Sequence, residues 1–483
     1  MRSDQTSTGS RNDSAAPRKH GCPRRSLPRY PPPRPRRAAA RRPTAGAPLA
    51  RRLLGDAAGG RRTPAEPARP REPRRAGSTT RAIWAVGLSF LVMVSFSALP
   101  TPLYVLYQRQ EGFSASVLTW IFAVYAVGVA AALFLAGHLS DLVGRVPMLR
   151  WALLSEVAAT ILFLVWPQVP GLLLARVLTG LGVGIATPTA TAYIAELHAR
   201  CSRRPDPGKA ATISSLVNMG GFALGPLVSG TLGQLASRPL VLPFVVYLVL
   251  FAAVAVGTYF VPETVTRSDR RVRYAPQRLS VPGDPAQFAA ACLGAAVAFA
   301  TNGLMMALIP TILEEAMGWT SRLAAGVVPA AACVSAALVP PLVTARALPR
   351  HQVWTTLIGT PAGLALLAYS VASGEPRIFL TAGIVAGGAA GVLFRVSMAT
   401  AARLAPIERR GEAMATAFLA AYCGLSVPVL LVGFALESAS LATVIVGFAV
   451  LATVAVVSAG TAILRTQSAL SGRQCPRNVA TGS

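Results

Sequence analysis

Acidic residues are scarce in this sequence, and charge of either sign is low. Of the 483 residues only 13% are charged, and 19 Asp and Glu stand against 46 Lys and Arg. A soluble domain carries about 25% charged residues. Because 53% of the residues are hydrophobic, the composition excludes a wholly disordered chain and disfavours a soluble globular enzyme. It favours a protein that crosses a membrane many times.

Paired cysteines and the common catalytic motifs are also missing. The six cysteines have no C-x-x-C or other metal-ligand spacing, which excludes a disulfide framework and a metal site. The sequence has no G-x-x-x-x-G-K-[ST] loop for ATP and no Ser/His/Asp arrangement for catalysis. We therefore expect neither an enzyme nor an ATP-driven pump, and no cofactor.

The first 80 residues have a composition of their own. Residues 1–80 hold 20 of the 46 Lys and Arg, with many Pro and Ala. Such a segment has too little apolar mass to offset the entropy of folding, so we expect a disordered, basic, Arg- and Pro-rich cytoplasmic tail. A patch on anionic lipid and a stretch that precedes the true start of translation are alternatives. Because aromatic rings for base stacking are nearly absent, no nucleic-acid partner is expected.

Twelve apolar segments follow, each long enough to cross about 30 Å of hydrocarbon. They lie near residues 82–105, 115–137, 148–166, 170–195, 209–235, 240–261, 286–313, 322–344, 352–372, 377–402, 411–436 and 440–464. A polar break divides them six and six. The sequence thus predicts an all-α membrane protein with six-helix halves at 81–262 and 286–465, a cytoplasmic linker at 263–285 and a cytoplasmic tail at 466–483.

Basic residues between the segments indicate the orientation in the membrane. If the N-terminus is inside, the inner loops and the C-terminal tail carry 19 Lys and Arg. The outer loops then carry only Arg109, Arg238, Arg322 and Arg377. Because cytoplasmic loops are enriched in Lys and Arg, this bias predicts that both termini are cytoplasmic.

The two halves repeat each other weakly. Gly180 and Gly184 of the fourth segment match Gly387 and Gly391 of the tenth at an offset of 207 residues. Two similar halves are typical of transporters that hold their substrate near the bilayer midplane, between parallel repeats.

The most specific motif is G-H-L-S-D-L-V-G-R-V-P-M-L-R at 137–150, between the second and third segments. Gly137 and Gly144 permit a tight turn between two helices. Asp141 can accept hydrogen bonds from backbone N–H groups at a helix start. Arg145 can pair with a carboxylate or with a helix C-terminus across the loop.

This spacing of Gly, Asp, Gly and Arg resembles the signature of the major facilitator superfamily, and the resemblance covers roughly residues 81–465. It implies a transporter of twelve transmembrane helices in the inner or plasma membrane. It further implies a functional monomer that handles a small-molecule substrate and protons within the lipid bilayer. In that family this loop acts as a gating latch when the inner side is closed, and the resemblance implies the same role for Asp141 and Arg145. Val146 departs from the signature, because a second basic residue is common there.

Two charged residues lie inside first-half segments. Arg176 lies about six residues from the outer face of the fourth segment, where a charge costs at least about 2.5 kcal/mol. It resembles an arginine of the family's proton-coupled exporters, although snorkelling to the outer interface is an alternative. Glu156 is the acid deepest in the first half, and a carboxyl group there suits a proton carrier. Pairing with a neighbouring helix is the alternative for Glu156.

The fifth segment contains G-F-A-L-G-P-L-V-S-G at 221–230. Gly225 and Pro226 predict a kink, since proline leaves a carbonyl without its helical partner. Together with Gly221 and Gly230 they resemble the family's antiporter motif, in which Ser229 stands where a glycine is usual. The partial motif favours export over uptake modestly. The alternative is a kink that serves helix packing alone.

Two second-half residues complete the candidate pathway. Asn302 in the seventh segment precedes Gly303 and predicts a helix interruption that faces the cavity, with plain packing as the alternative. Arg395 in the tenth segment is the deepest second-half charge and a candidate contact for an anionic substrate or a coupling acid. Structural pairing is the alternative for Arg395.

These features together predict proton-coupled efflux of a small amphiphilic, drug-like compound by alternating access. Proton-coupled uptake of a sugar or another metabolite is one alternative. A receptor or regulator that no longer transports, and that signals through its basic tail, is another.

Overall fold

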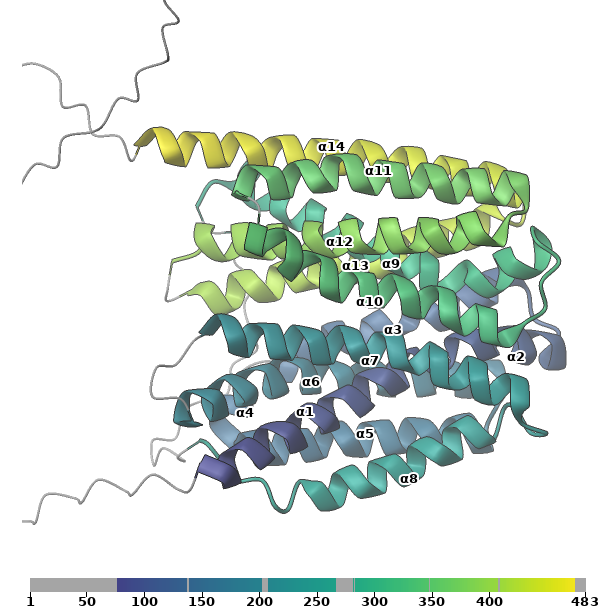
Figure 1. Cartoon of the computed structure of the whole chain (residues 1–483). Helices are drawn as coiled ribbons and strands as arrows, with labels where there is room; N and C mark the ends of the chain where they lie inside the picture. The colour runs from purple at the N-terminus through teal and green to yellow at the C-terminus, as the bar shows by residue number, and fades with distance from the viewer. Residues whose placement is uncertain are drawn as a thin grey trace, which may run out of the picture. The chain divides into compact units, whose positions relative to one another are not determined.

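In the computed structural model, α-helices account for nearly all of the described residues (Figure 1). The structure describes residues 76–136, 139–201, 207–265, 281, 283–346, 348–406 and 409–473. Most of the predicted N-terminal tail and of the 263–285 linker lies outside these ranges, as do residues 474–483. The first half comprises α1 (Ala76–Ala98), η1 (Thr101–Leu103), α2 (Tyr104–Glu111), α3 (Ala115–Ala136), α4 (Leu139–Val143), α5 (Arg145–Val165), α6 (Val169–Cys201), α7 (Pro207–Leu235) and α8 (Leu242–Gly257). The second half comprises α9 (Pro285–Glu315), α10 (Arg322–Arg346), α11 (Pro349–Ser373), α12 (Pro376–Leu404), α13 (Arg410–Ala435) and α14 (Leu441–Arg473).

The helices have the lengths that a membrane requires. Within the described residues, eleven helical spans are long and apolar enough to cross a bilayer. The remaining predicted segment, 240–261, is α8, an apolar helix of 16 residues, or about 24 Å at 1.5 Å per residue. The predicted all-α, multi-span architecture is confirmed.

Several helix ends differ from the sequence prediction. Helix α1 begins at Ala76, inside the predicted tail, and α14 continues to Arg473, beyond residue 465. Hydropathy marks only the part of a helix that matches hydrocarbon, whereas backbone hydrogen bonding continues into the polar surroundings. The loop expected at 137–150 likewise contains a short helix, α4, and α5 begins there at Arg145.

The first predicted segment, 82–105, is interrupted. Helix α1 ends at Ala98, and the N–H of Leu99 bonds back to Phe96 O at 3.1 Å. Pro100 follows and has no N–H to continue the helix, so the chain turns through η1 before α2 carries it to Glu111. The interruption leaves carbonyl groups at the end of α1 free to accept other donors.

The internal repeat is visible in how the helices pack. A Cβ on Gly180 of α6 would lie 2.1 Å from the carbonyl oxygen of Tyr125 in α3. A Cβ on Gly387 of α12 would lie 2.4 Å from the carbonyl oxygen of Ala332 in α10. The two glycines are 207 residues apart, and so are their two partners. The two halves therefore bring corresponding helices together through the same close backbone contact.

Candidate functional site

Gly144 permits the sharp turn between α4 and α5. Its φ is +116°, a conformation that residues with a Cβ rarely adopt. A Cβ there would also lie 2.7 Å from Glu263 Oε2. Both backbone conformation and space therefore require glycine at this position. Gly137, the other predicted turn residue, lies outside the described residues.

Arg145, the first residue of α5, is the centre of an ionic cluster. Its guanidinium forms ion pairs with Asp141 Oδ1 at 2.6 Å and Glu196 Oε1 at 2.7 Å. It also donates to Ser140 Oγ at 2.6 Å. Glu196 lies near the end of α6, so Arg145 joins α4, α5 and α6. We call Asp141, Arg145, Glu196 and Glu263 the Arg145 network.

Glu263, which follows α8, completes the Arg145 network by capping α5. Its carboxylate accepts from the backbone N–H of Arg145 and of Val146, each at 3.0 Å. Burial alone would raise the pKa of Glu263. The backbone N–H groups of Val265, Arg145, Val146 and Thr264 together hold that pKa below its ordinary value of 4.5. The acceptor at this helix start is therefore Glu263, whereas Asp141, predicted for that role, pairs with Arg145.

The lowered pKa of Glu263 predicts an acid-dependent loss of stability. A group with a depressed pKa stabilises the folded state above its unfolded pKa, and this contribution is lost as the pH falls through the folded value. The melting temperature should therefore fall below pH 4.5 more steeply in the wild-type protein than in Glu263→Gln. At pH 7 we expect the variant to melt lower by only about 2 °C, because Glu263 is only partly buried and solvent screens its interactions. Glu437→Gln, at an exposed position after α13, is the control. An equally steep fall of the melting temperature below pH 4.5 in the wild type and in Glu263→Gln would contradict the role of Glu263 as the acceptor at the start of α5.

Arg176 lies inside the first half and does not reach the surface. Its side chain is 2% exposed, which contradicts the alternative of snorkelling to the outer interface. Its Nη1 donates to Ser97 O at 2.6 Å, a carbonyl in the last turn of α1 before the interruption at Pro100. Its Cζ lies 4.7 Å from the centroid of the Tyr125 ring. A cation at a helix C-terminus and over an aromatic face is favourable in both respects.

Glu156 of α5 is the second charged group of this region. Its side chain is fully buried, and neither carboxylate oxygen has a hydrogen-bond partner among the described residues. Oε1 lies against α6, because a Cβ on Gly182 would be 2.7 Å from it. Arg176, on the neighbouring helix α6, is likewise buried. We call Glu156 and Arg176 the buried charge pair.

The internal repeat has no counterpart of this pair in the second half. An offset of 207 residues places Gly363 of α11 at the position of Glu156 and Gly383 of α12 at that of Arg176. A Cβ on Gly363 would lie 2.6 Å from the backbone nitrogen of Ala386 in α12. In the second half, glycine therefore allows the corresponding helices to pack closely. At these two positions the charges belong to the first half alone.

The glycines of the 221–230 motif contact helices of both halves. A Cβ on Gly225 would lie 2.1 Å from Ser95 O of α1, and Gly221 lies against Val94 of the same helix. A Cβ on Gly230 would lie 2.6 Å from Arg322 O of α10. Pro226 lies inside α7, which continues unbroken from Pro207 to Leu235. The motif therefore brings α7 close to α1 on one side and to α10 on the other.

Asn302 and Arg395 do not join the buried charge pair. Helix α9 is continuous through Asn302 and Gly303, so the predicted interruption is wrong. Asn302 Nδ2 donates to Ala298 O at 3.0 Å within the helix, and a Cβ on Gly303 would lie 2.8 Å from Leu425 O of α13. Gly303 is thus a close-packing residue. Arg395 is exposed on α12 and forms no hydrogen bond or ion pair within the part of the chain that the structure describes.

Sequence reasoning missed several groups of the site. Glu196 had no motif to mark it, and Ser97 contributes only a backbone carbonyl. Glu263 stands in a Pro-Glu-Thr sequence at the end of the sixth segment, which is the one local signal that could have marked it.

Comparisons with known proteins agree with this architecture. The profile of the Major Facilitator Superfamily matches residues 85–371. Among solved structures, the nucleoside transporter NupG superposes with a TM-score of 0.62 at 13% identity, covering 80% of this chain and 99% of that one. The human organic anion transporter MFSD10 superposes with a TM-score of 0.58 at 14% identity, covering 79% of this chain and 99% of that one. At these identities the likeness concerns the fold alone.

Curated relatives match over shorter stretches. The major facilitator-type transporter psiT2 of Psilocybe cyanescens is 29% identical over 181 residues, which are 34% of this chain and 33% of that protein. The puromycin resistance protein pur8 of Streptomyces alboniger is 31% identical over 127 residues, which are 26% of this chain and 25% of that protein. The chain thus aligns with a third or less of the length of these relatives.

Proposed function

Because the chain belongs to the Major Facilitator Superfamily, whose members are secondary transporters, we propose that it exports small amphiphilic, drug-like compounds in exchange for protons. The proposal places it in the cell membrane as a monomer with both termini in the cytoplasm. The first half supplies the proton site, and the substrate passes between the two halves by alternating access.

The observation that carries this proposal is the buried charge pair. An ionised carboxylate without hydrogen-bond donors is costly to bury, and intramembrane carboxylates commonly serve proton relays. In the proposed cycle, a proton binds a carboxylate oxygen of Glu156 while the site is open to the outside. The same O–H bond breaks, and the proton leaves, when the site is open to the cytoplasm. Arg176 stays charged throughout and stabilises the deprotonated carboxylate.

Two further features support export over uptake. The 221–230 motif resembles, in part, the antiporter motif of the family, and its glycines lie at contacts with α1 and α10. A relative of part of this chain is named a puromycin resistance protein, and resistance to a drug is commonly obtained by expelling it. Uptake of a metabolite has no comparable support.

The test uses inside-out membrane vesicles whose lumen has been made acidic. A panel of lipophilic and amphiphilic compounds is added, and the pH gradient is followed with a fluorescent dye. We expect selected compounds to dissipate part of the gradient, and we expect this response to disappear in Arg176→Gln. The exposed Arg377 at the start of α12 provides a matched control, since Arg377→Gln should respond like the wild type.

The remaining outcomes separate the alternatives. No response across the panel, with the protein shown to be inserted, would contradict drug export. Uptake of a labelled metabolite into right-side-out vesicles would then favour symport. Deletion of residues 2–78 should leave the flux of a transporter intact, whereas a regulator that signals through its tail should lose its effect.

A further inference from the structure

Charged residues join the two halves near α2, at the end of the helices opposite α4 of the Arg145 network (Figure 1). Arg109, in the last turn of α2, forms an ion pair with Glu314, near the end of α9. Helix α2 belongs to the first half and α9 to the second. This contact therefore ties together two parts that must separate if a path is to open at this end.

Arg322, the first residue of α10, makes a second connection between the halves. Its Nη1 donates to Gly233 O at 2.6 Å, and its backbone N–H donates to Gln234 Oε1 at 3.1 Å. Helix α7 ends at Leu235, so Gly233 carries one of the last carbonyls, which have no partner within the helix. The cation of Arg322 thus caps the C-terminus of a helix from the other half.

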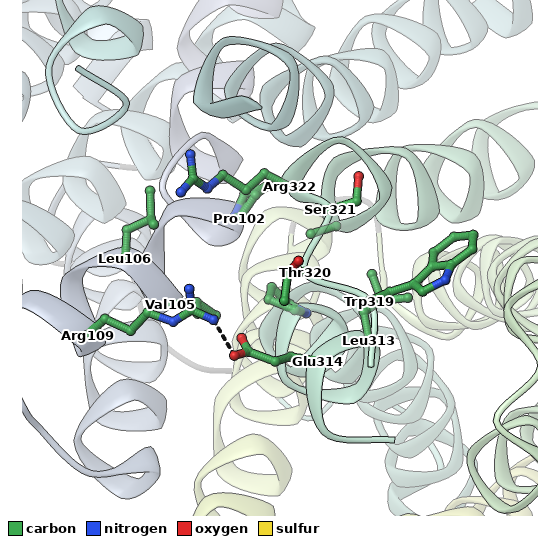
Figure 2. A pocket seen from close by; sticks show the side chains of 12 residues that line it. Pro102, Val105, Leu106, Arg109, Leu313, Glu314, Trp319, Thr320, Ser321 and Arg322 are labelled. Carbon is green, nitrogen blue, oxygen red and sulfur yellow. Dashed lines mark hydrogen bonds and ion pairs between the residues drawn. The ribbon is translucent and has the colours of Figure 1, made fainter. Parts of the chain in front are cut away.

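The space between these two connections is nearly filled. Arg109, Glu314 and Arg322 border a cavity of about 30 Å³, together with Trp319 and apolar residues of η1 and α2 (Figure 2). Sites for drug-sized molecules measure about 300–1,000 Å³, whereas about 10–15 Å³ suffices for one water molecule. This end of the bundle therefore has no room for a substrate to pass between the connections.

The charge pattern of the sequence offers an independent reason to single out these residues. Only Arg109, Arg238, Arg322 and Arg377 oppose the bias of Lys and Arg toward the cytoplasmic side. Two of these four, Arg109 and Arg322, are the residues that join the halves. Basic residues on the disfavoured side that make contacts between the halves are better explained by a role in those contacts than by topology.

We propose that Arg109, Glu314 and Arg322 form an outer latch that holds the outer ends of the two halves together whenever the substrate site faces the cytoplasm. The latch acts by position and touches neither substrate nor proton. An exposed ion pair is weak, and a hydrogen bond from a cation to a carbonyl is moderate. The latch therefore opens reversibly and biases the equilibrium between inward-facing and outward-facing states.

The experiment measures how readily another part of the boundary between the two halves opens. Thr119 of α3 is 1% exposed and lies against Gly433 of α13, so it belongs to the boundary between the halves but not to the latch. In a chain whose six native cysteines are replaced by serine or alanine, Thr119→Cys is the reporter. Its labelling rate by a membrane-impermeant thiol reagent is measured in right-side-out and in inside-out vesicles.

Charge reversal and charge exchange provide the decisive variants. Arg109→Glu and Glu314→Arg should each raise labelling from the outside by about three- to tenfold, because each places like charges opposite one another. The exchanged double variant should return to within about twofold of the starting rate. Arg322→Ala should raise labelling by about fivefold, because Gly233 O loses its donor. Arg377→Glu makes the same charge change away from the latch and should have no effect.

Two results would overturn the proposal. One is an unchanged labelling rate in both single reversals, with the protein intact by size-exclusion chromatography. The other is a double variant that labels as fast as the single ones, which would mean that the two charges do not act on each other. The measurement requires neither substrate nor proton gradient. The outer latch is therefore tested separately from the proposed proton-coupled export.

Discussion

Replacing Glu156 by Gln is expected to abolish transport driven by a proton gradient while leaving substrate exchange in place. The amide matches the carboxyl group in size, so packing against Gly182 should be retained. The amide carries no titratable proton, and the change of charge that couples the gradient to the conformational cycle is lost. In proteoliposomes we expect gradient-driven flux to fall by at least about tenfold. Counterflow of labelled compound against unlabelled compound should stay within about twofold of wild type.

The control for this prediction is Glu437→Gln, which removes a carboxylate from an exposed position after α13 and should alter neither measurement. Loss of both activities in Glu156→Gln, with a lowered melting temperature, would point to a structural role for the carboxyl group. Gradient-driven flux at the wild-type level would exclude Glu156 as the coupling site. Arg395 on α12 would then be the next charged residue to examine.

Replacing Gly225 by Ala is expected to destabilise the protein and to weaken transport. The new Cβ would lie 2.1 Å from the carbonyl oxygen of Ser95 and 3.0 Å from the backbone nitrogen of Leu99. Because both contacts are with backbone atoms, α1 and α7 must move apart, at a cost of about 1–3 kcal/mol for an overpacked interior. The displaced end of α1 carries Ser97 O, the acceptor of Arg176. The substitution should therefore lower the melting temperature and weaken gradient-driven flux together.

Gly447→Ala is the matched control for this second prediction. A Cβ on Gly447 of α14 meets nothing within 4 Å, and alanine is the better helix former by about 1 kcal/mol. This variant should melt at or slightly above the wild-type temperature and should transport normally. Equal melting temperatures for Gly225→Ala and Gly447→Ala would show that α1 and α7 move apart at little cost. This result would contradict the prediction drawn from their close backbone contact.

The membrane-spanning helices of this protein were predictable because hydropathy is a local property. A run of apolar residues has to be buried in hydrocarbon or in protein wherever it occurs, and its length indicates whether it can cross a membrane. Gly144 was predictable for a similar reason, since a positive φ is a demand of the backbone itself. The interruption of the first segment at Pro100 was not recognised, although proline has no N–H to donate.

The partners of the charged residues were not predictable. Arg145 is a clear feature of its motif, yet its acceptor Glu196 is 51 residues away and is brought to it by the antiparallel packing of α5 and α6. Asn302 illustrates the opposite case. Its sequence context predicted a break, but the side chain bonds within its own helix and Gly303 packs closely on α13.

The sequence by itself determined that this chain forms a series of apolar helices, and it predicts that most of the basic residues lie on one side of the membrane. These properties depend on residue type and spacing along the chain. Only the tertiary structure decided that Arg176 binds the end of α1, and that Arg109 meets Glu314 across the boundary between the halves. The physical reason is that such contacts join residues tens to hundreds of positions apart. Their formation depends on how helices pack through small residues rather than on any local preference.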